Sequence, residues 1–217
     1  MEINLNSTIA ILGGAGKAGR PLVEEVLTAG YRVRLLLRHP EKFDLTSERM
    51  EIIPGDARDP ASVRALLQGC AALLSTLGHP KGEPTPITAA VTKILITTAG
   101  ELGIKRYVVV SSLFTTGEEK HDPETKQAAA FMQKHFPLMM DDRRLEFQLL
   151  LESRLDWTYV RVPYIIQNPA VGGVKVNLDH LPGPRIRATD LARFLVDQLN
   201  DRRYIRQSPF VASDQPA

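Results

Sequence analysis

The stretch Thr8-Ile9-Ala10-Ile11-Leu12-Gly13-Gly14-Ala15-Gly16-Lys17-Ala18-Gly19 decides the fold, because an apolar run passes directly into a glycine-rich loop. Its first five residues, 8–12, are typical of a short buried strand. Residues 17–28 then carry apolar side chains at helical spacing, and Gly30 follows as a helix-ending residue. The stretch therefore predicts a strand, a tight loop and a helix in direct succession.

The glycines of this loop satisfy two spacings at once, Gly13/Gly16/Gly19 and Gly14/Gly16/Gly19. In dinucleotide-binding folds the first glycine permits a tight turn, the middle one lets backbone approach the pyrophosphate, and the last allows close helix–strand packing. The positive N-terminal end of the helix attracts the phosphates. A plain turn is the alternative, but the flanking strand and helix favour dinucleotide binding. The residues expected to contact the cofactor are Gly13, Gly14, Ala15, Gly16, Lys17, Ala18 and Gly19.

Strand-like and helix-like patterns alternate along most of the chain. They predict an α/β fold of Rossmann type, with a doubly wound parallel sheet in a three-layer α/β/α arrangement. A length of 217 residues suits a single NAD(P)-binding domain over residues 1–217. We expect strands at 8–12, 31–38, 50–53, 71–75, 105–110 and 157–161, and helices at 17–28, 60–67, 85–102, 138–153 and 189–199.

Four local features refine this picture. Asp59 before Pro60 predicts an N-cap, and Thr85-Pro86 predicts a capped helix start with proline in the first turn. The segment 116–137 is polar at its start and breaks the alternation, so we expect an excursion over the sheet and a candidate lid, with a short helix. Residues 172–187 suggest an irregular hairpin.

Arg38 ends the second strand, which is the position that distinguishes the two nicotinamide cofactors. A carboxylate there binds the ribose 2′-hydroxyl, whereas an arginine suits a 2′-phosphate. The strand end, Arg38-His39-Pro40-Glu41-Lys42, is predominantly basic. NADP(H) is therefore the expected cofactor and NAD(H) is less favoured; a solvated strand end is the alternative.

Polar or small residues follow three further strands. Asp56 is placed to accept a hydrogen bond from the adenine amino group, or else serves as a turn residue. Gly78 either lets backbone approach the cofactor or simply makes a turn. Ser111 and Ser112 end the fifth strand, at the sheet edge where ligands bind, so their hydroxyls are expected to reach the nicotinamide or the substrate; serine also ends strands for structural reasons.

The chain resembles the atypical short-chain dehydrogenase/reductase group, in the NmrA-like branch that includes biliverdin-IXβ/flavin reductase. The resemblance covers nearly the whole chain and implies an NAD(P)-binding Rossmann fold, without fixing the substrate. The motifs that carry it are Leu12-Gly13-Gly14-Ala15-Gly16-Lys17-Ala18-Gly19, Leu37-Arg38, Gly55-Asp56, Val110-Ser111-Ser112, Leu155-Asp156-Trp157-Thr158-Tyr159-Val160-Arg161 and Arg187-Ala188-Thr189-Asp190-Leu191-Ala192.

One departure from ordinary short-chain dehydrogenases bears on the chemistry. Those enzymes use a Tyr-x-x-x-Lys pair as proton donor and cofactor anchor, but none of the five tyrosines here has lysine four residues on. Alcohol–ketone interconversion therefore lacks its usual acid. Reduction of a flavin, quinone or tetrapyrrole demands less, because the resulting anion is delocalised and takes its proton from water.

Two more residues are candidates for the substrate side. Relatives often carry lysine or histidine where this chain has Asp141-Asp142-Arg143-Arg144, and Arg143 is expected either to attract an anionic substrate or to lie on an exposed helix paired with Asp141 or Glu146. Tyr164, beyond the sixth strand, is expected either to stack on an aromatic substrate or to pack under a loop.

Composition limits the partners. A net charge of +2 gives no electrostatic case for nucleic acid or a membrane surface, so we expect a small-molecule substrate and a monomer or homodimer. A single cysteine, Cys70, excludes an internal disulfide and a thiolate metal site, and the five histidines show no metal-ligand spacing. With no basic-apolar leader pattern at the start of the sequence, we expect a cytoplasmic protein.

Two functions fit these features. The first is an NADPH-dependent reductase of flavins, quinones or similar flat conjugated acceptors, in which the cofactor supplies the chemistry. The second is a non-catalytic redox sensor of NmrA type, which binds NADP(H) and reports its state to a partner. Ser111-Ser112 and a short substrate side favour the enzyme.

Overall fold

The central feature of the fold is an eight-stranded sheet, in the order β3-β2-β1-β4-β5-β6-β10-β8. The computed structural model describes residues 3–79, 85–113, 120–170 and 172–214. All neighbouring strands of this sheet are parallel except β8, which pairs antiparallel with β10. The strands are β1 (Thr8–Leu12), β2 (Arg32–Leu37), β3 (Met50–Pro54), β4 (Ala72–Ser75), β5 (Arg106–Ser111), β6 (Asp156–Arg161), β8 (Val174–Asn177) and β10 (Phe210–Ser213).

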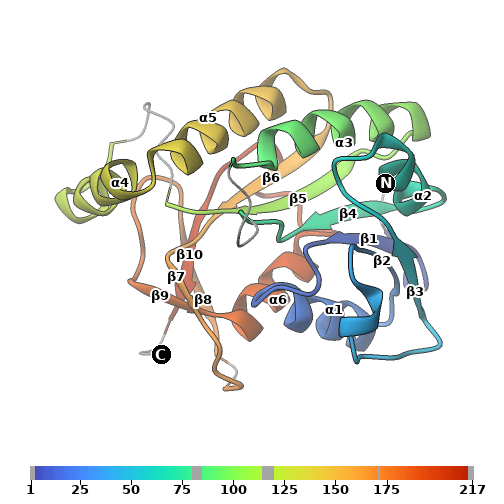
Figure 1. The fold of residues 1–217 in the computed structure, drawn as a ribbon. Helices are drawn as coiled ribbons and strands as arrows, with labels where there is room; N and C mark the ends of the chain where they lie inside the picture. The colour runs from blue at the N-terminus through green and yellow to red at the C-terminus, as the bar shows by residue number, and fades with distance from the viewer. Residues whose placement is uncertain (1–2, 80–84, 114–119, 171, 215–217) are drawn as a thin grey trace.

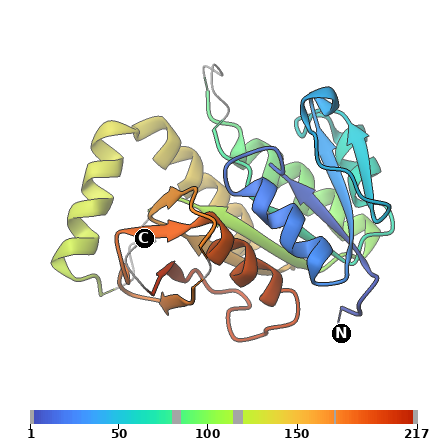
Figure 2. The ribbon, with the colours of Figure 1, turned by 90° about the horizontal axis from the view of Figure 1, so that it is seen from below.

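Helices cover both faces of the sheet, as Figure 1 shows. Helices α1 and α6 pack together on one face, and in the view from below they lie side by side in front of the strands (Figure 2). Helices α2, α3 and α5 cover the other face. This arrangement confirms the predicted three-layer Rossmann-type fold. The helices are α1 (Gly19–Thr28), α2 (Pro60–Leu67), α3 (Thr88–Leu102), α4 (Pro123–His135), α5 (Pro137–Glu152) and α6 (Ala188–Asp197), with a 3-10 turn η1 (Pro40–Lys42).

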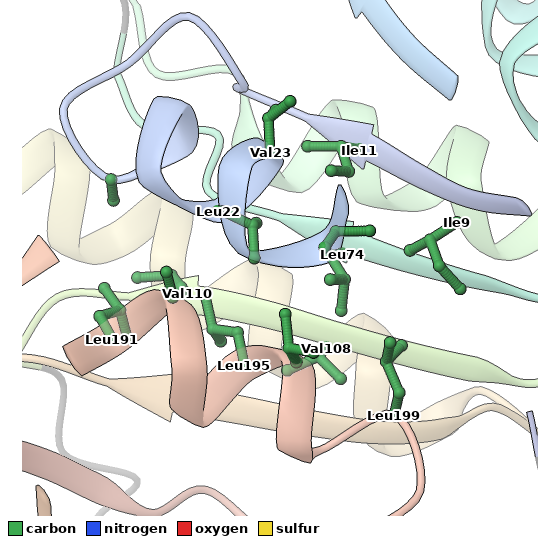
Figure 3. Packing of buried hydrophobic residues seen from close by; sticks show 14 of the residues in the cluster. Ile9, Ile11, Leu22, Val23, Leu74, Val108, Val110, Leu191, Leu195 and Leu199 are labelled. Carbon is green, nitrogen blue, oxygen red and sulfur yellow. The ribbon is translucent and has the colours of Figure 1, made fainter. Parts of the chain in front are cut away.

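Two apolar clusters, one on each face, hold the layers together. Figure 3 shows the first, where Leu22 of α1 and Leu195 of α6 pack on Ile11 and Val108 of the strands. All four of these side chains are buried. Burying a leucine or valine side chain stabilises a fold by about 1.5–3 kcal/mol, so these contacts fix the strand ends at which the site is built.

Most predicted element boundaries lie within two residues of those observed, but the start of α3 does not. The helix begins at Thr88, and Thr85-Pro86 precede it without capping it. Its first turn is capped instead by a side chain far along the chain, because the Asp142 carboxylate of α5 accepts from the backbone N–H groups of Thr88 (3.0 Å) and Ala89 (3.3 Å). By contrast, Asp59 caps α2 as predicted.

The C-terminal third departs further from prediction. Residues 172–187 do not form a hairpin, because β8 pairs with β10, while β9 (Arg185–Arg187) pairs in parallel with β7 (Tyr164–Ile166) in a separate small sheet. Strand β10 was not predicted at all. These strands are three or four residues long, so their partners are chosen by tertiary packing rather than by local pattern.

The segment predicted as a lid contains a longer helix than expected, α4. Residues 114–119 lie outside the described part of the chain, and α4 then runs for 13 residues from an Asp122 N-cap. Of its side chains only Thr125 is buried, and both views place α4 at the edge of the molecule farthest from α2. Among the described residues, no helix combines the length and apolar character needed to cross a lipid bilayer.

Candidate functional site

The glycine loop connects β1 to α1 and adopts a conformation that side chains would disrupt. Gly13 has a left-handed φ of +79°, and a Cβ there would lie 2.7 Å from the backbone nitrogen of Leu77. A Cβ on Gly19 would collide with the Gly13 carbonyl oxygen. Gly16, in contrast, has only that carbonyl within reach of its Cβ, at 3.2 Å, and otherwise faces open space. The first and last glycines therefore close the turn, and the middle one exposes backbone.

A cavity of about 710 Å³ lies over this loop at the carboxyl edge of the sheet. Its size suits an extended organic ligand. It reaches from the ends of β2 and β3 on one side of β1 to the end of β4 on the other. The lining residues are Leu12, Gly13, Ala15, Gly16, Lys17, Ala18, Leu36, Leu37, Arg38, His39, Lys42, Gly55, Asp56, Ala57, Thr76, Leu77, Gly78, His79, Ile87 and Ile165.

The cavity lining is rich in positive charge. Lys17, Arg38 and Lys42 line it, and Asp56 is the single carboxylate among the described lining residues. The hydrogen-bonded Arg58 guanidinium lowers the pKa of Asp56 below its ordinary value, so the carboxylate stays ionised at neutral pH, paired to Arg58 at 2.7 Å. The charge left over is positive, which suits a ligand with several phosphates.

The segment that carries Lys42 is held against α1. Arg20, in the first turn of α1, forms an ion pair with Asp44, and its guanidinium lies 6.0 Å from the centre of the Phe43 ring. These contacts bring the basic stretch that begins at Arg38 next to the glycine loop.

Asp56 and Gly78 line the cavity as well, beside the predicted residues of the glycine loop and Arg38, and their local roles differ. Asp56 accepts from the backbone N–H of Arg58 at 2.8 Å, which is the turn role anticipated as an alternative. Its contact with an adenine amino group stays a prediction. Gly78 follows β4, and a Cβ there would meet nothing within 4 Å, so space alone does not require glycine.

Ser111 is the first correction among the predicted catalytic residues. It is only 2 % exposed, and its hydroxyl donates to the hydroxyl of Tyr159 at 2.8 Å, inside the protein. Tyr159 in turn donates to the Glu146 carboxylate at 2.9 Å. Successive side chains of a strand point to opposite faces, and Ser111 lies on the face covered by α5. Its hydroxyl is therefore turned away from a ligand at the sheet edge.

Ser112, the next residue, keeps its candidacy. Its Oγ is buried and has no hydrogen-bond partner within the described ranges. A buried hydroxyl without a partner is costly and calls for a bound group to complete it. Ser112 is not among the described residues that line the 710 Å³ cavity, so its contact with a cofactor or substrate stays a prediction.

Arg143 and Tyr164 depart in part from expectation. Arg143 pairs with Glu146 at 2.7 Å, as the alternative expected, but the pair is buried rather than on an exposed helix face, and Arg143 is only 5 % exposed. Burial opposes its charge, but the Glu146 carboxylate raises the pKa of Arg143 above its ordinary value, so it is cationic. Tyr164 is 68 % exposed and packs under no loop; because side chains alternate along β7, Ile165 lines the cavity instead.

Sequence reasoning missed several lining residues. Lys42 was present in the basic run after Arg38, and that run was the available signal. Leu77 and Ile87 carry no local signal, since apolar residues in loops are common and only tertiary packing brings these two to the cavity.

A second cavity, of about 1030 Å³, lies at the opposite, amino edge of the sheet near Cys70 and Arg106. It lacks the glycine loop, and ligands of open α/β sheets bind at the carboxyl ends of the strands, so the smaller cavity is the candidate site. Burial raises the pKa of Cys70 to about 11, which keeps its thiol protonated at neutral pH. In the described parts of the chain, no three His, Cys, Asp or Glu side chains are grouped to hold a metal ion.

Comparison with known proteins agrees with this geometry. Residues 13–202 match the NAD(P)H-binding family. Cinnamoyl-CoA reductase 1 of Oryza sativa subsp. japonica is 29 % identical over 114 residues, which cover 48 % of this chain and 34 % of that protein. The chain thus spans about a third of the length of this relative.

Two solved structures share the fold over nearly their full length. A short-chain dehydrogenase/reductase of wide type from Veillonella parvula, in complex with NADP, has a TM-score of 0.80 at 16 % identity and covers 96 % of this chain and 95 % of its own. ChuY, an anaerobillin reductase from Escherichia coli O157:H7, has a TM-score of 0.79 at 19 % identity, and the match covers 97 % of this chain and 100 % of ChuY. With the match over residues 13–202, the chain belongs to the NAD(P)H-binding family and has the Rossmann-type fold of short-chain dehydrogenases/reductases.

Proposed function

We propose that this protein is an NADPH-dependent reductase that delivers hydride to a flat conjugated acceptor, such as a flavin, a quinone or a tetrapyrrole. The observation that carries the proposal is the basic cavity over the glycine loop, in which the described lining includes no tyrosine. A reductase without a tyrosine acid needs an acceptor whose reduced anion is already stabilised.

The residues present fit a phosphorylated dinucleotide. Gly13 and Gly19 hold the loop so that backbone at Gly16 faces the cavity, and α1 begins there without a capping side chain from the described residues. Its N-terminal end is therefore available to the pyrophosphate. Arg38 and Lys42, at the β2 side of the cavity, favour a 2′-phosphate and hence NADP(H) over NAD(H).

The bound dinucleotide supplies the hydride. Burial raises the pKa of Tyr159 well above its ordinary value, as it does for Tyr107, so neither phenol releases a proton near neutral pH. Tyr164 points into solvent. Among the hydroxyls predicted for the site, Ser112 is the one we assign to orient the nicotinamide or the acceptor, and the reduced acceptor takes its proton from water.

The relatives support a reductase without naming the acceptor. Two of them are described as reductases, of cinnamoyl-CoA and of anaerobillin. The proposal also takes residues 1–217 as one domain, residues 116–137 as its lid, and the cytoplasm as its location; these stay predictions.

The test is steady-state oxidation of NADPH by the unmodified protein with flavin mononucleotide, a short-chain quinone or biliverdin as acceptor. We expect turnover with at least one of them, at a rate that saturates with acceptor. Tight binding of NADPH without turnover of any acceptor would contradict the enzyme and favour the NmrA-like sensor.

A further inference from the structure

The wall of the cavity on the β4 side includes the two described ends of the connection from β4 to α3. Thr76, Leu77 and Gly78 form its first part and Ile87 its last, and all four line the cavity. Residues 80–84 lie outside the described ranges, so the inference concerns the two ends of this connection.

Both ends are held by consecutive residues of α5. The Arg143 Nη2 donates to the carbonyl oxygen of Leu77 at 3.2 Å. The Asp142 carboxylate accepts from the backbone N–H groups of Thr88 and Ala89, where α3 begins. Figure 1 shows α5 and α3 side by side over the same face of the sheet. This packing places Asp142 at the start of α3 and Arg143 at Leu77.

The hydrogen bond from Arg143 to Leu77 is made by a buried cation, and burying a cation contributes little to stability by itself. Arg143 and Glu146 are 5 % and 2 % exposed, and a buried ion pair is often no more stabilising than apolar side chains of similar size. Glu146 is fixed in turn by hydroxyl donors, Thr92 and Tyr159, each at 2.9 Å. The Arg143 Nε has no hydrogen-bond partner in the described structure, so the ion pair with Glu146 leaves one donor of the guanidinium unsatisfied.

The effect of this contact reaches the glycine loop. The Leu77 nitrogen abuts Gly13 so closely that a Cβ on Gly13 would lie 2.7 Å away. The Thr76 hydroxyl donates to the Gly13 carbonyl at 3.2 Å. A shift of Leu77 would therefore move the wall against which Gly13 is set.

We propose that Asp142 and Arg143 are positioning residues for the cofactor: together they clamp the two ends of the β4–α3 connection and so shape the half of the cavity beyond the glycine loop. The inference rests on the proposed dinucleotide binding. The adenosine half lies on the β2–β3 side, where the strand end recognises its ribose, so the clamp serves the nicotinamide half.

The experiment compares two ligands. NADPH occupies both halves of the cavity, whereas adenosine 2′,5′-bisphosphate occupies only the half on the β2–β3 side. The main variant is Arg143→Met with Glu146→Gln, which removes the Leu77 contact and leaves no lone buried charge. The glutamine keeps one acceptor oxygen for one of the two hydroxyl donors, Thr92 and Tyr159, and presents its amide N–H2 to the other. Calorimetry should show NADPH bound about tenfold more weakly, with the bisphosphate changed less than about twofold.

A matched control uses another buried i,i+3 pair, Arg187–Asp190, which lines neither cavity. Arg187→Met with Asp190→Asn should leave both affinities within about twofold, even if stability falls. Should the main variant fold poorly, Arg143→Lys keeps a positive charge beside Glu146 but has a single terminal nitrogen, so it lacks the guanidinium fork whose second nitrogen reaches Leu77. It should also weaken NADPH selectively.

Equal weakening of both ligands, or no weakening of either, would overturn the inference while leaving the proposed function in place. Failure of the unmodified protein to bind either ligand would overturn the proposed function and, with it, the inference.

Discussion

The two halves of the candidate cavity are built in different ways. On the β2–β3 side the chemistry lies in short contiguous stretches, the glycine loop and the run that begins at Arg38, each placed by its own strand end. On the β4 side the wall is held from a distance, by Asp142 and Arg143 of α5. The first half is therefore specified by local sequence and the second by tertiary packing.

The largest expected effect lies in the local half. Gly16→Val would place a branched side chain where the pyrophosphate must lie, and it meets little of the protein itself, so NADPH binding should be lost while the fold is kept. Fluorescence titration with NADPH measures the loss of binding, and circular dichroism checks that the fold is kept. Gly100→Ala, where an added Cβ meets nothing within 4 Å, is the control and should bind normally. Normal binding by the Gly16 variant would show that the phosphate site is elsewhere.

Arg38→Ala should give the next largest effect and also tests the local half. Loss of a charge-assisted phosphate contact costs about 1.5–3 kcal/mol, roughly a 10- to 150-fold weaker affinity for NADPH. The affinity for NADH, which lacks the 2′-phosphate, should barely change. Arg32→Ala, at the exposed opposite end of the same strand, should leave both affinities unaltered. An equal loss for both cofactors would refute a role in discrimination.

Variants of Ser112 and Ser111 test which of these two consecutive residues at the end of β5 faces the ligand. Ser112→Ala should slow turnover roughly 10- to 100-fold, because a group that orients the nicotinamide or acceptor is removed. Ser111→Ala should act mainly on stability, because its hydroxyl belongs to the buried Tyr159–Glu146 network. Steady-state rates and thermal unfolding separate these effects. The reverse pattern would mean that Ser111 is the residue that faces the ligand.

Turnover should change by less than about twofold between pH 6 and 8. The raised pKa of Tyr159 keeps its phenol protonated throughout this range, and the lowered pKa of Asp56 keeps its carboxylate ionised, so neither changes charge. A pH–rate profile with saturating NADPH measures this. A steep limb inside the range would show that a titrating group of the cavity, such as His39 or His79, takes part in turnover, which the proposed mechanism does not include.

Tyr164→Phe should have the smallest effect. The side chain is 68 % exposed and keeps its ring in the variant, so kcat and KM for the acceptor should stay within about twofold. Inactivation would show that Tyr164 reaches the substrate.

The same contrast explains what could be predicted from sequence. Thr8–Leu12 with its glycines, and Asp59 ahead of Pro60, carry their structure in adjacent residues, and both were predicted. The start of α3 was misplaced because its cap, Asp142, comes from 54 residues away. The pairing of Arg143 with Glu146 was among the alternatives predicted from their i,i+3 spacing, but the burial of the pair was not, because burial depends on the packing of α5 against the rest of the fold.

The most direct test of the central claim is calorimetric titration of the unmodified protein with NADPH and with NADH. We expect one binding site per chain, with NADPH bound at least about tenfold more tightly than NADH. The cations at the β2 side of the cavity add a contact with the 2′-phosphate, which NADH lacks. Equal affinities for the two cofactors, or no binding of either, would contradict it.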